Sequence, residues 1–328
     1  MTERDYTIKH WQNIAAYMRR GKVAFFRSAD RIALLYAKIP PDVPFELALY
    51  PGIKLDIEKE LRYLASQLQV NIVNGINNEW MLSNAKNDLL VTDMLGGKSL
   101  PPALQQKWMG RNLAALNAFT KRTEGGLGLS DRVWSLVRQN AINIEQHMAL
   151  GIKEGTSASK LASEMKQYLN DPDKLFRRVR DAGGELRLSK AASEYNPGRG
   201  RYRSAYKNAM RLTRTETNRA YQQADNARWN DMDFVLGIEV RRSNTPYQCD
   251  ICEAGKGKYP KDYNWILWHP NCRCNAVPIR ASRDAFLDSV EAAGKGQDYQ
   301  FDGYVKDVPD SWNNFQQANP NYTHWGHD

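Results

Sequence analysis

All four cysteines of this 328-residue chain lie in one short window, between Cys249 and Cys274. Disulfide-stapled secreted proteins instead distribute their cysteines along the chain, so that bridges link distant segments. The window contains Cys249-x2-Cys252, then sixteen residues, then the run His269-Pro-Asn-Cys272-Arg-Cys274. It therefore offers five side chains of the kinds that bind metal ions, and this clustering favours a metal site.

Zinc is the ion that this set of side chains favours. Zn²⁺ prefers four ligands in a tetrahedron, and thiolates and imidazoles suit it. A Cys-x2-Cys turn directs two sulfurs at one point, while a second pair arrives from elsewhere in the chain. We therefore expect a structural Zn²⁺ held by four of the five side chains. The preferred set is Cys249, Cys252, Cys272 and Cys274, with His269 outside it, and the main alternative set is Cys249, Cys252, His269 and Cys272.

The same residues leave other interpretations open. The cysteines could form two disulfides or remain free thiols, although a cytoplasm keeps cysteines reduced. A catalytic zinc needs an open coordination position and a general acid or base, such as the Glu of a HExxH motif, and neither this motif nor the HxE motif of deaminases is present. The histidines outside the window are remote from it in sequence: His10, His147, His324 and His327. We therefore predict no enzymatic activity and no catalytic residues.

Composition is that of an ordinary globular protein. With 42% hydrophobic and 25% charged residues, the chain is long enough for two or three globular units. No apolar run reaches the roughly 20 residues of a membrane-spanning helix, and residues 1–9 lack a signal-peptide-like stretch. We expect a soluble protein made in a cytoplasm, with no membrane segment. The formal charge of +9 favours polyanionic partners such as nucleic acid, although a modest excess is also ordinary solubility chemistry.

Apolar periodicity predicts a mainly α-helical chain, built of bundles and hairpins, with a small α+β zinc-binding module towards the C-terminus. Residues 1–125 form the N-terminal helical region, because proline and glycine clusters separate stretches of helical periodicity. The helices expected in it lie at residues 11–37, 54–70, 76–95 and 103–122. Consecutive glycines in residues 123–128 predict a linker at its end.

Residues 126–200 are expected to form a helical hairpin followed by a mobile basic loop. Ser130 can cap the first helix, which Gly151 would end. Thr156 or Ser157 can cap the second helix, before Asp171 and Pro172 stop it. Glycines, prolines and charged residues then predict the exposed loop at residues 182–202.

Residues 201–280 combine a long helix with the cysteine window. We expect the helix over residues 203–231, and β-branched residues predict a strand at 238–240 that pairs with 277–279. Residues 199–219 hold seven Lys/Arg against the single Glu216, a stripe that could contact phosphates or an acidic protein, or be a solvated helix face. The residues predicted to contact DNA or a partner are Arg199, Arg201, Arg203, Lys207 and Arg211.

Arg214, Glu216 and Arg273 are candidates for supporting the metal site without binding the ion. Glu216 and Arg219 are three residues apart on the expected helix and can pair. One interpretation is therefore a solvated ion pair. The other is that Arg214 or Glu216 braces the cysteine window from outside.

Residues 281–328 differ in composition, with eight acidic residues against three basic ones. Their aromatic residues are scattered through loop-like sequence: Trp312, Phe315, Tyr322 and Trp325. We expect an extended acidic arm, whose aromatic rings either dock on a neighbouring protein or belong to a tail that is frayed or packed on its own chain.

The motifs together resemble the phage head morphogenesis family, the minor head proteins similar to protein F of phage Mu. The matching elements occur in order: Arg-Thr-Glu at residues 214–216, Cys249-x2-Cys252, a short Gly-containing insert, and the run from His269 to Cys274 followed by Val-Pro-Ile. With the helical stretch that precedes them, the resemblance covers residues 128–280.

The resemblance implies a minor capsid protein, present in few copies near the portal of a tailed bacteriophage. It implies a place in the virion after assembly in the host cytoplasm, and roles in head assembly and in DNA packaging or ejection. The implied partners are the portal protein, the major capsid protein and packaged double-stranded DNA. Residues 1–125 would then contact portal or capsid, and residues 201–280 would be the head morphogenesis module. The alternative function is that of a zinc-containing DNA-binding protein or nuclease.

Overall fold

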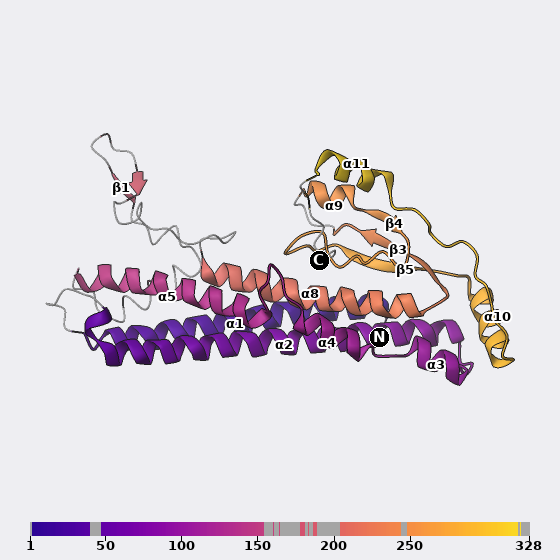
Figure 1. The fold of residues 1–328 in the computed structure, drawn as a ribbon, viewed down its shortest axis with the longest axis horizontal. Coiled ribbons are helices and arrows are strands. Elements are labelled where there is room, and N and C mark those ends of the chain that lie inside the picture. Colours follow the sequence, from indigo (N-terminus) through magenta and orange to yellow (C-terminus); the bar gives the residue numbers. More distant parts are fainter. Residues whose placement is uncertain are drawn as a thin grey trace. The chain divides into compact units, whose positions relative to one another are not determined.

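A computed structural model describes residues 2–39, 47–153, 204–243 and 248–320, the short stretches 178–180 and 186–188, and residues 160, 164, 183 and 322. The chain is mainly helical, with a small three-stranded antiparallel sheet next to a Cys/His cluster, so the predicted fold class is confirmed (Figure 1). Among the described residues, no helix combines the length and apolar character needed to cross a membrane.

Two compact units make up the chain, and neither is one consecutive stretch. Unit 1 comprises Met1–Ala15, Val73–Arg122 and Arg214–Asp328, and unit 2 comprises Ala16–Ile72 and Thr123–Thr213. Of the boundaries between the four consecutive regions predicted from the sequence, the one near residue 125 lies closest to a unit boundary. The other unit boundaries fall inside long helices. The helical periodicity continues through these boundaries, so the sequence does not indicate them.

The first helix, α1 (Glu3–Tyr36), begins eight residues before the predicted start. Its first turn is closed by reciprocal hydrogen bonds, in which the Asp5 amide donates to Thr2 Oγ1 at 3.3 Å and the Thr2 amide donates to Asp5 Oδ2 at 2.6 Å. This arrangement is a capping box, which satisfies amides that the helix itself leaves unpaired. The cap, rather than the apolar periodicity, sets where the helix starts.

The second long helix, α2 (Pro51–Leu95), joins two helices that the sequence predicts separately. Pro51 occupies the first helical position, and Gly96 at φ 58° follows the last one, as expected for these residue types. The predicted gap at residues 71–75 is helical, and Asn71 in it hydrogen-bonds to another helix. Its Nδ2 donates to the Tyr17 carbonyl at 2.9 Å, and Ile72 is buried.

The single helix predicted over residues 103–122 is instead two helices, α3 (Pro102–Trp108) and α4 (Leu113–Lys121). Asn112 lies between them at φ 48°, in the left-handed region that asparagine tolerates better than most residues. The Arg111 carbonyl before it accepts a hydrogen bond from Trp80 Nε1 at 2.9 Å. A short turn, η1 (Leu47–Leu49), precedes α2.

The next helix, α5 (Leu129–Lys153), runs through Gly151 and begins before Ser130, so both predicted end signals are wrong. The side chain of Asp131 caps it instead, accepting from the Gly128 amide at 3.1 Å. The predicted second helix of the hairpin lies outside the described residues, except Lys160 and Glu164, which are helical. The described part of the predicted loop contains a strand, β2 (Leu186–Leu188), paired antiparallel with β1 (Arg178–Arg180).

The long helix α8 (Ala205–Asp231) matches the prediction and leads into the sheet, whose strand order is β4-β3-β5. Strands β3 (Val235–Arg241) and β5 (Asn275–Arg280) pair antiparallel, with Glu239 opposite Val277, which confirms the predicted pairing. The strand β4 (Gly257–Tyr259) was not predicted. On β3, Ile238 and Val240 are buried while Arg241 is exposed, so one face of the sheet covers the core.

Buried polar side chains join the C-terminal parts of α2 and α8 within unit 1. Asp225 accepts from Ser83 Oγ at 2.7 Å and from Asn87 Nδ2 at 2.7 Å, and its other oxygen lies 2.5 Å from Lys86 Nζ. Arg228 donates to Asn84 Oδ1 at 3.0 Å and pairs with Asp88 at 3.0 Å. Each of these charged groups has an opposite charge as its partner.

Residues 281–328 are not an extended arm in their described part, which contains α10 (Arg283–Gly294) and α11 (Asp310–Ala318). Ser282 caps α10, and Phe286 and Val290, four residues apart, are buried on its inner face. Trp312 of α11 is also buried, with its ring centroid 4.1 Å from that of Trp268. The described part of the segment therefore packs on its own chain. Trp325 lies outside the described residues.

Candidate metal centre

Two short elements bring the cysteines together. Cys249 occupies the N-cap position of the one-turn helix α9 (Asp250–Ala254), which also contains Cys252. Cys272 and Cys274 arrive on the chain that enters β5. Asn271, just before them, has φ 65°, a left-handed conformation that turns the chain from His269 towards the cysteines.

The five predicted side chains converge within this module. The His269 Nε2 atom lies 3.3 Å from Cys249 Sγ and 3.1 Å from Cys252 Sγ, while Cys252 Sγ lies 3.8 Å from Cys272 Sγ. Two groups of ligand atoms result, each with all atoms within 4.8 Å of one another: Cys249, Cys252 and His269, and Cys252, Cys272 and Cys274. The cluster could therefore hold a metal ion, with Cys252 common to both groups.

None of the four cysteines forms a disulfide, so the disulfide interpretation finds no support. Both predicted four-ligand sets take members from both groups, and the choice between them stays a prediction. Cys252, Cys272 and Cys274 are buried, and Cys249 is half-buried.

The second ring nitrogen of His269 has its own partner. Nδ1 lies 2.9 Å from the carbonyl oxygen of Pro270. A carbonyl can only accept, so Nδ1 carries the hydrogen and a neutral ring keeps its lone pair on Nε2. That lone pair points at the two sulfurs of the Cys-x2-Cys turn, which is the arrangement found in histidines that bind metal.

The buried thiols perturb one another. Hydrogen bonding from Cys252, helped by Cys274, lowers the pKa of Cys272 well below that of an ordinary thiol. The same contact with Cys272 raises the pKa of Cys252. Cys272 is therefore the sulfur most readily present as thiolate, the form that binds metal ions.

Helix α8 braces the loop of residues 269–274 through two residues that were not predicted from the sequence. Thr215 Oγ1 accepts from the Asn271 amide at 3.2 Å, and Asn218 Nδ2 donates to the Cys272 carbonyl at 3.1 Å. Both side chains are buried. Their spacing of three residues, which puts them on one helix face, is the signal that could have pointed to them.

A buried chain of polar contacts continues from this brace. Asn218 Oδ1 lies 3.0 Å from His10 Nε2, and His10 Nδ1 lies 2.6 Å from Glu79 Oε2. Asn13 Nδ2 donates to the other oxygen of Glu79 at 2.9 Å, and the His10 ring stacks on Tyr221 at 4.0 Å between centroids. Although His10 is remote from the cysteines in sequence, it is linked to the backbone of Cys272 through one side chain.

The predicted supporting residues have varied surroundings. Glu216 is only 1% exposed and pairs with Arg122 at 2.6 Å, and Arg219 is also buried, so the interpretation as a solvated ion pair is wrong. Arg214 is half-buried and Arg273 is exposed. Of the predicted basic stripe, Lys207 is exposed and Arg211 half-buried on α8. The others, Arg199, Arg201 and Arg203, lie outside the described residues.

Aromatic side chains pack around the loop that contains His269 and Cys272. Trp268 lies so close to Gly255 that an added Cβ would be 2.4 Å from its ring, which explains the glycine after α9. Tyr322 donates its hydroxyl hydrogen to the Trp268 carbonyl, and Trp312 covers the Trp268 ring. The described C-terminal residues therefore complete the packing around this loop.

Comparisons with protein-family models, curated proteins and solved structures found no match to this chain. The chemistry of the site and the sequence motifs are therefore the basis on which a function can be inferred.

Proposed function

We propose that this chain is a minor head protein of a tailed bacteriophage, which acts near the portal in head assembly and in DNA packaging or ejection. The observation that carries the proposal is the contact between the two halves of the motif behind the family resemblance. The Arg-Thr-Glu helix touches the His-Pro-Asn-Cys loop through Thr215 and Asn271, and Asn218 holds the carbonyl of Cys272. Motifs more than fifty residues apart in sequence thus form one structural unit.

We further propose that the Cys/His cluster holds a structural Zn²⁺. Thiolates and an imidazole suit zinc, and a tetrahedron with Zn–S bonds of about 2.3 Å has sulfur–sulfur edges of about 3.8 Å. Cys252 and Cys272 are separated by 3.8 Å, and the free lone pair of His269 faces two sulfurs. Cys249, Cys252, His269 and Cys272 form one candidate ligand set, and the four cysteines form the other, because Cys274 also lies within 4.8 Å of Cys252 and Cys272. A set of four protein ligands leaves no open position, so the role proposed for the ion is structural.

Two measurements test whether the cluster binds zinc and which residues are its ligands. Elemental analysis of protein purified without added metal should give about one zinc per chain, with thiols released for titration by a chelator. The variants His269→Ala and Cys274→Ser then separate the two ligand sets. Loss of a ligand should weaken zinc binding by more than the 10- to 100-fold typical of a supporting residue. A larger loss for Cys274→Ser than for His269→Ala would favour the four-cysteine set, and an absence of zinc would exclude both.

The role in the virion needs a test of its own. Mass spectrometry of purified particles of the phage that encodes this chain should detect it in few copies, and cross-linking should join it to the portal protein. Absence from particles, together with strong salt-sensitive binding to duplex DNA, would favour a DNA-binding protein outside the virion. A metal-dependent nicking activity that His269→Ala abolishes would instead identify a nuclease.

A further inference from the structure

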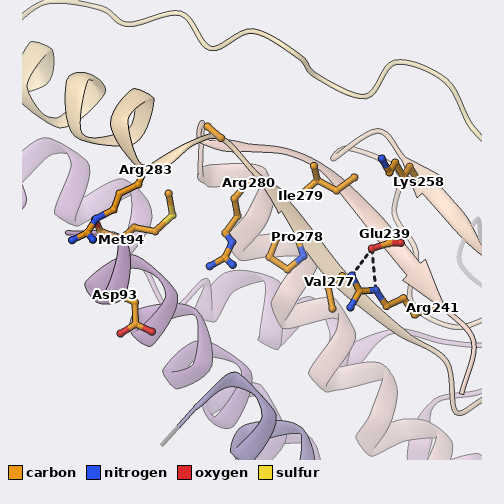
Figure 2. Close-up of a pocket in the computed structure, with 11 residues that line it drawn as sticks. Asp93, Met94, Glu239, Arg241, Lys258, Val277, Pro278, Ile279, Arg280 and Arg283 are labelled. Carbon is orange, nitrogen blue, oxygen red and sulfur yellow. Dashed lines mark hydrogen bonds and ion pairs between the residues drawn. The ribbon is translucent and has the colours of Figure 1, made fainter. Parts of the chain in front are cut away.

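An open trough of about 630 Å³ lies beside the small sheet (Figure 2). Its lining combines residues of β3 and β4, the whole second half of β5, the end of α2 and the first residue of α10. All of these elements belong to unit 1. None of the metal-binding candidates lines the trough.

The trough covers the outer face of the sheet and reaches the edge of β5, because Lys258, Glu239 and Val277 lie opposite one another across β4, β3 and β5. Residues 277–281 line it consecutively, whereas successive side chains of a strand point to opposite faces. The trough therefore also extends around β5, which is an edge strand in the order β4-β3-β5. Pro278 has no amide hydrogen, so this edge cannot supply a continuous ladder to an added strand. An occupant would therefore be held mainly by side chains.

Positive charge is in excess around the trough. Four cations line it, Arg241, Lys258, Arg280 and Arg283, against the carboxylates Asp93 and Glu239. The lining therefore favours an occupant with negative charge.

Some of these charges already have partners. Glu239 accepts from Arg241 at 2.5 and 2.9 Å (Figure 2), and Arg280 meets Glu3 at 3.4 Å on an exposed surface. Within the described part of the chain, neither Lys258 nor Arg283 pairs with a carboxylate, and Arg283 uses only Nε to donate to the Met94 carbonyl. The guanidinium end of Arg283 and the Lys258 ammonium are thus available to an anionic occupant.

The rest of the lining is apolar, and this feature selects the kind of anion. Met94, Val277 and Ile279 line the trough between the cations. A phosphate backbone gains nothing from such an apolar surface, whereas an acidic peptide can pair its carboxylates with the cations and bury an apolar side chain beside them. We propose that the trough binds a short extended acidic segment of a partner protein, whose carboxylates pair with Lys258, Arg280 and Arg283 while an apolar side chain packs on Val277 and Ile279.

This proposal goes beyond the proposed function and does not depend on the metal. The test uses full-length, metal-loaded protein and fluorescence anisotropy. The probe is a short labelled peptide in which glutamates alternate with leucine and serine, and the matched probe has glutamine at every glutamate. The variant Lys258→Glu with Arg283→Glu removes the two exposed trough cations that pair with no carboxylate of the described residues. The control Lys121→Glu with Lys295→Glu makes the same change in net charge at exposed sites outside it.

The glutamate peptide should bind saturably, and the trough variant should weaken it roughly tenfold or more, because two exposed pairs of about 1 kcal/mol each are replaced by repulsion. The glutamine peptide should lose a similar factor, added salt should weaken binding, and the control variant should bind like the native protein. Absence of saturable binding, or an equal loss in the control variant, would overturn the proposal. Tighter binding of a labelled DNA duplex through the same two cations would assign the trough to phosphates instead. The zinc content of the trough variant should equal that of the native protein. The zinc proposal and the trough proposal can therefore be tested independently.

Discussion

Two groups of buried polar side chains in the described part of unit 1 differ in the contacts that hold each group together. Between α2 and α8, Asp225 has Lys86, Ser83 and Asn87 as partners, so donors and opposite charges are present in the fold. In the candidate metal centre, three buried sulfurs and the His269 ring converge, and the contacts among them join thiols to one another and to the imidazole. The first group is a network of matched charges, whereas the second has the ligand types of a metal site.

The largest loss of stability is expected in the Cys/His cluster, for which we propose a structural zinc ion. Cys252→Ser removes the residue common to both ligand groups, and structural zinc contributes roughly 10 to 16 kcal/mol of apparent binding free energy in small zinc domains. Hydrogen exchange should therefore rise sharply across residues 249–280, and a chelator should do the same to the native chain. Residues 16–36 of α1 should keep their protection. Unchanged exchange at residues 249–280 would contradict a structural metal.

The network between α2 and α8 should be disrupted when one charge of the Asp225–Lys86 pair is removed. Asp225→Ala leaves Lys86 as an uncompensated, largely buried charge, which should cost about 3 to 5 kcal/mol in the free energy of unfolding. Urea denaturation of metal-loaded protein measures this loss. The double variant Asp225→Leu with Lys86→Met removes both charges and should cost less than the single change. A double variant no more stable than Asp225→Ala would show that the ion pair is not the source of the loss.

Asn218 links the candidate metal centre to the buried His10 and should have an intermediate effect. Asn218→Ala leaves the Cys272 carbonyl and His10 Nε2 without this partner, a loss of about 1 to 3 kcal/mol. If the cluster binds zinc, the affinity should also fall by roughly 10- to 100-fold, as for other residues that orient a ligand. Stability comes from chemical denaturation and affinity from competition with a chromophoric chelator. A change in stability with unchanged affinity would confine Asn218 to packing.

The smallest effect is expected at an exposed ion pair. Asp56 and Lys59 lie 3.1 Å apart on α2, with side chains 48% and 65% exposed. Asp56→Asn should change the free energy of unfolding by less than about 0.5 kcal/mol, because water already solvates both groups. This variant is also the matched control for Asp225→Ala. A loss of several kcal/mol here would mean that charge removal is costly wherever it occurs in the chain.

Local patterns in the sequence were sufficient for several parts of the fold. The cysteine spacing identified the five residues that converge, and β-branched residues identified the pairing of β3 with β5. Helical periodicity predicted most of the helices. Where it failed, a local contact competed with it, as in the Thr2–Asp5 capping box, the Asn112 turn and the cap from Asp131.

The sequence by itself determined the chemistry of the cysteine window, because ligand type and spacing are local properties. Only the tertiary structure decided which residues support it. Thr215 and Asn218 reach the loop because α8 lies against it, and Asn218 in turn meets His10, 208 residues away in sequence. The packing of Trp312 on Trp268 and the trough along β5 likewise arise from segments far apart in the chain. Such contacts depend on where whole elements pack, and no local spacing of residues encodes that.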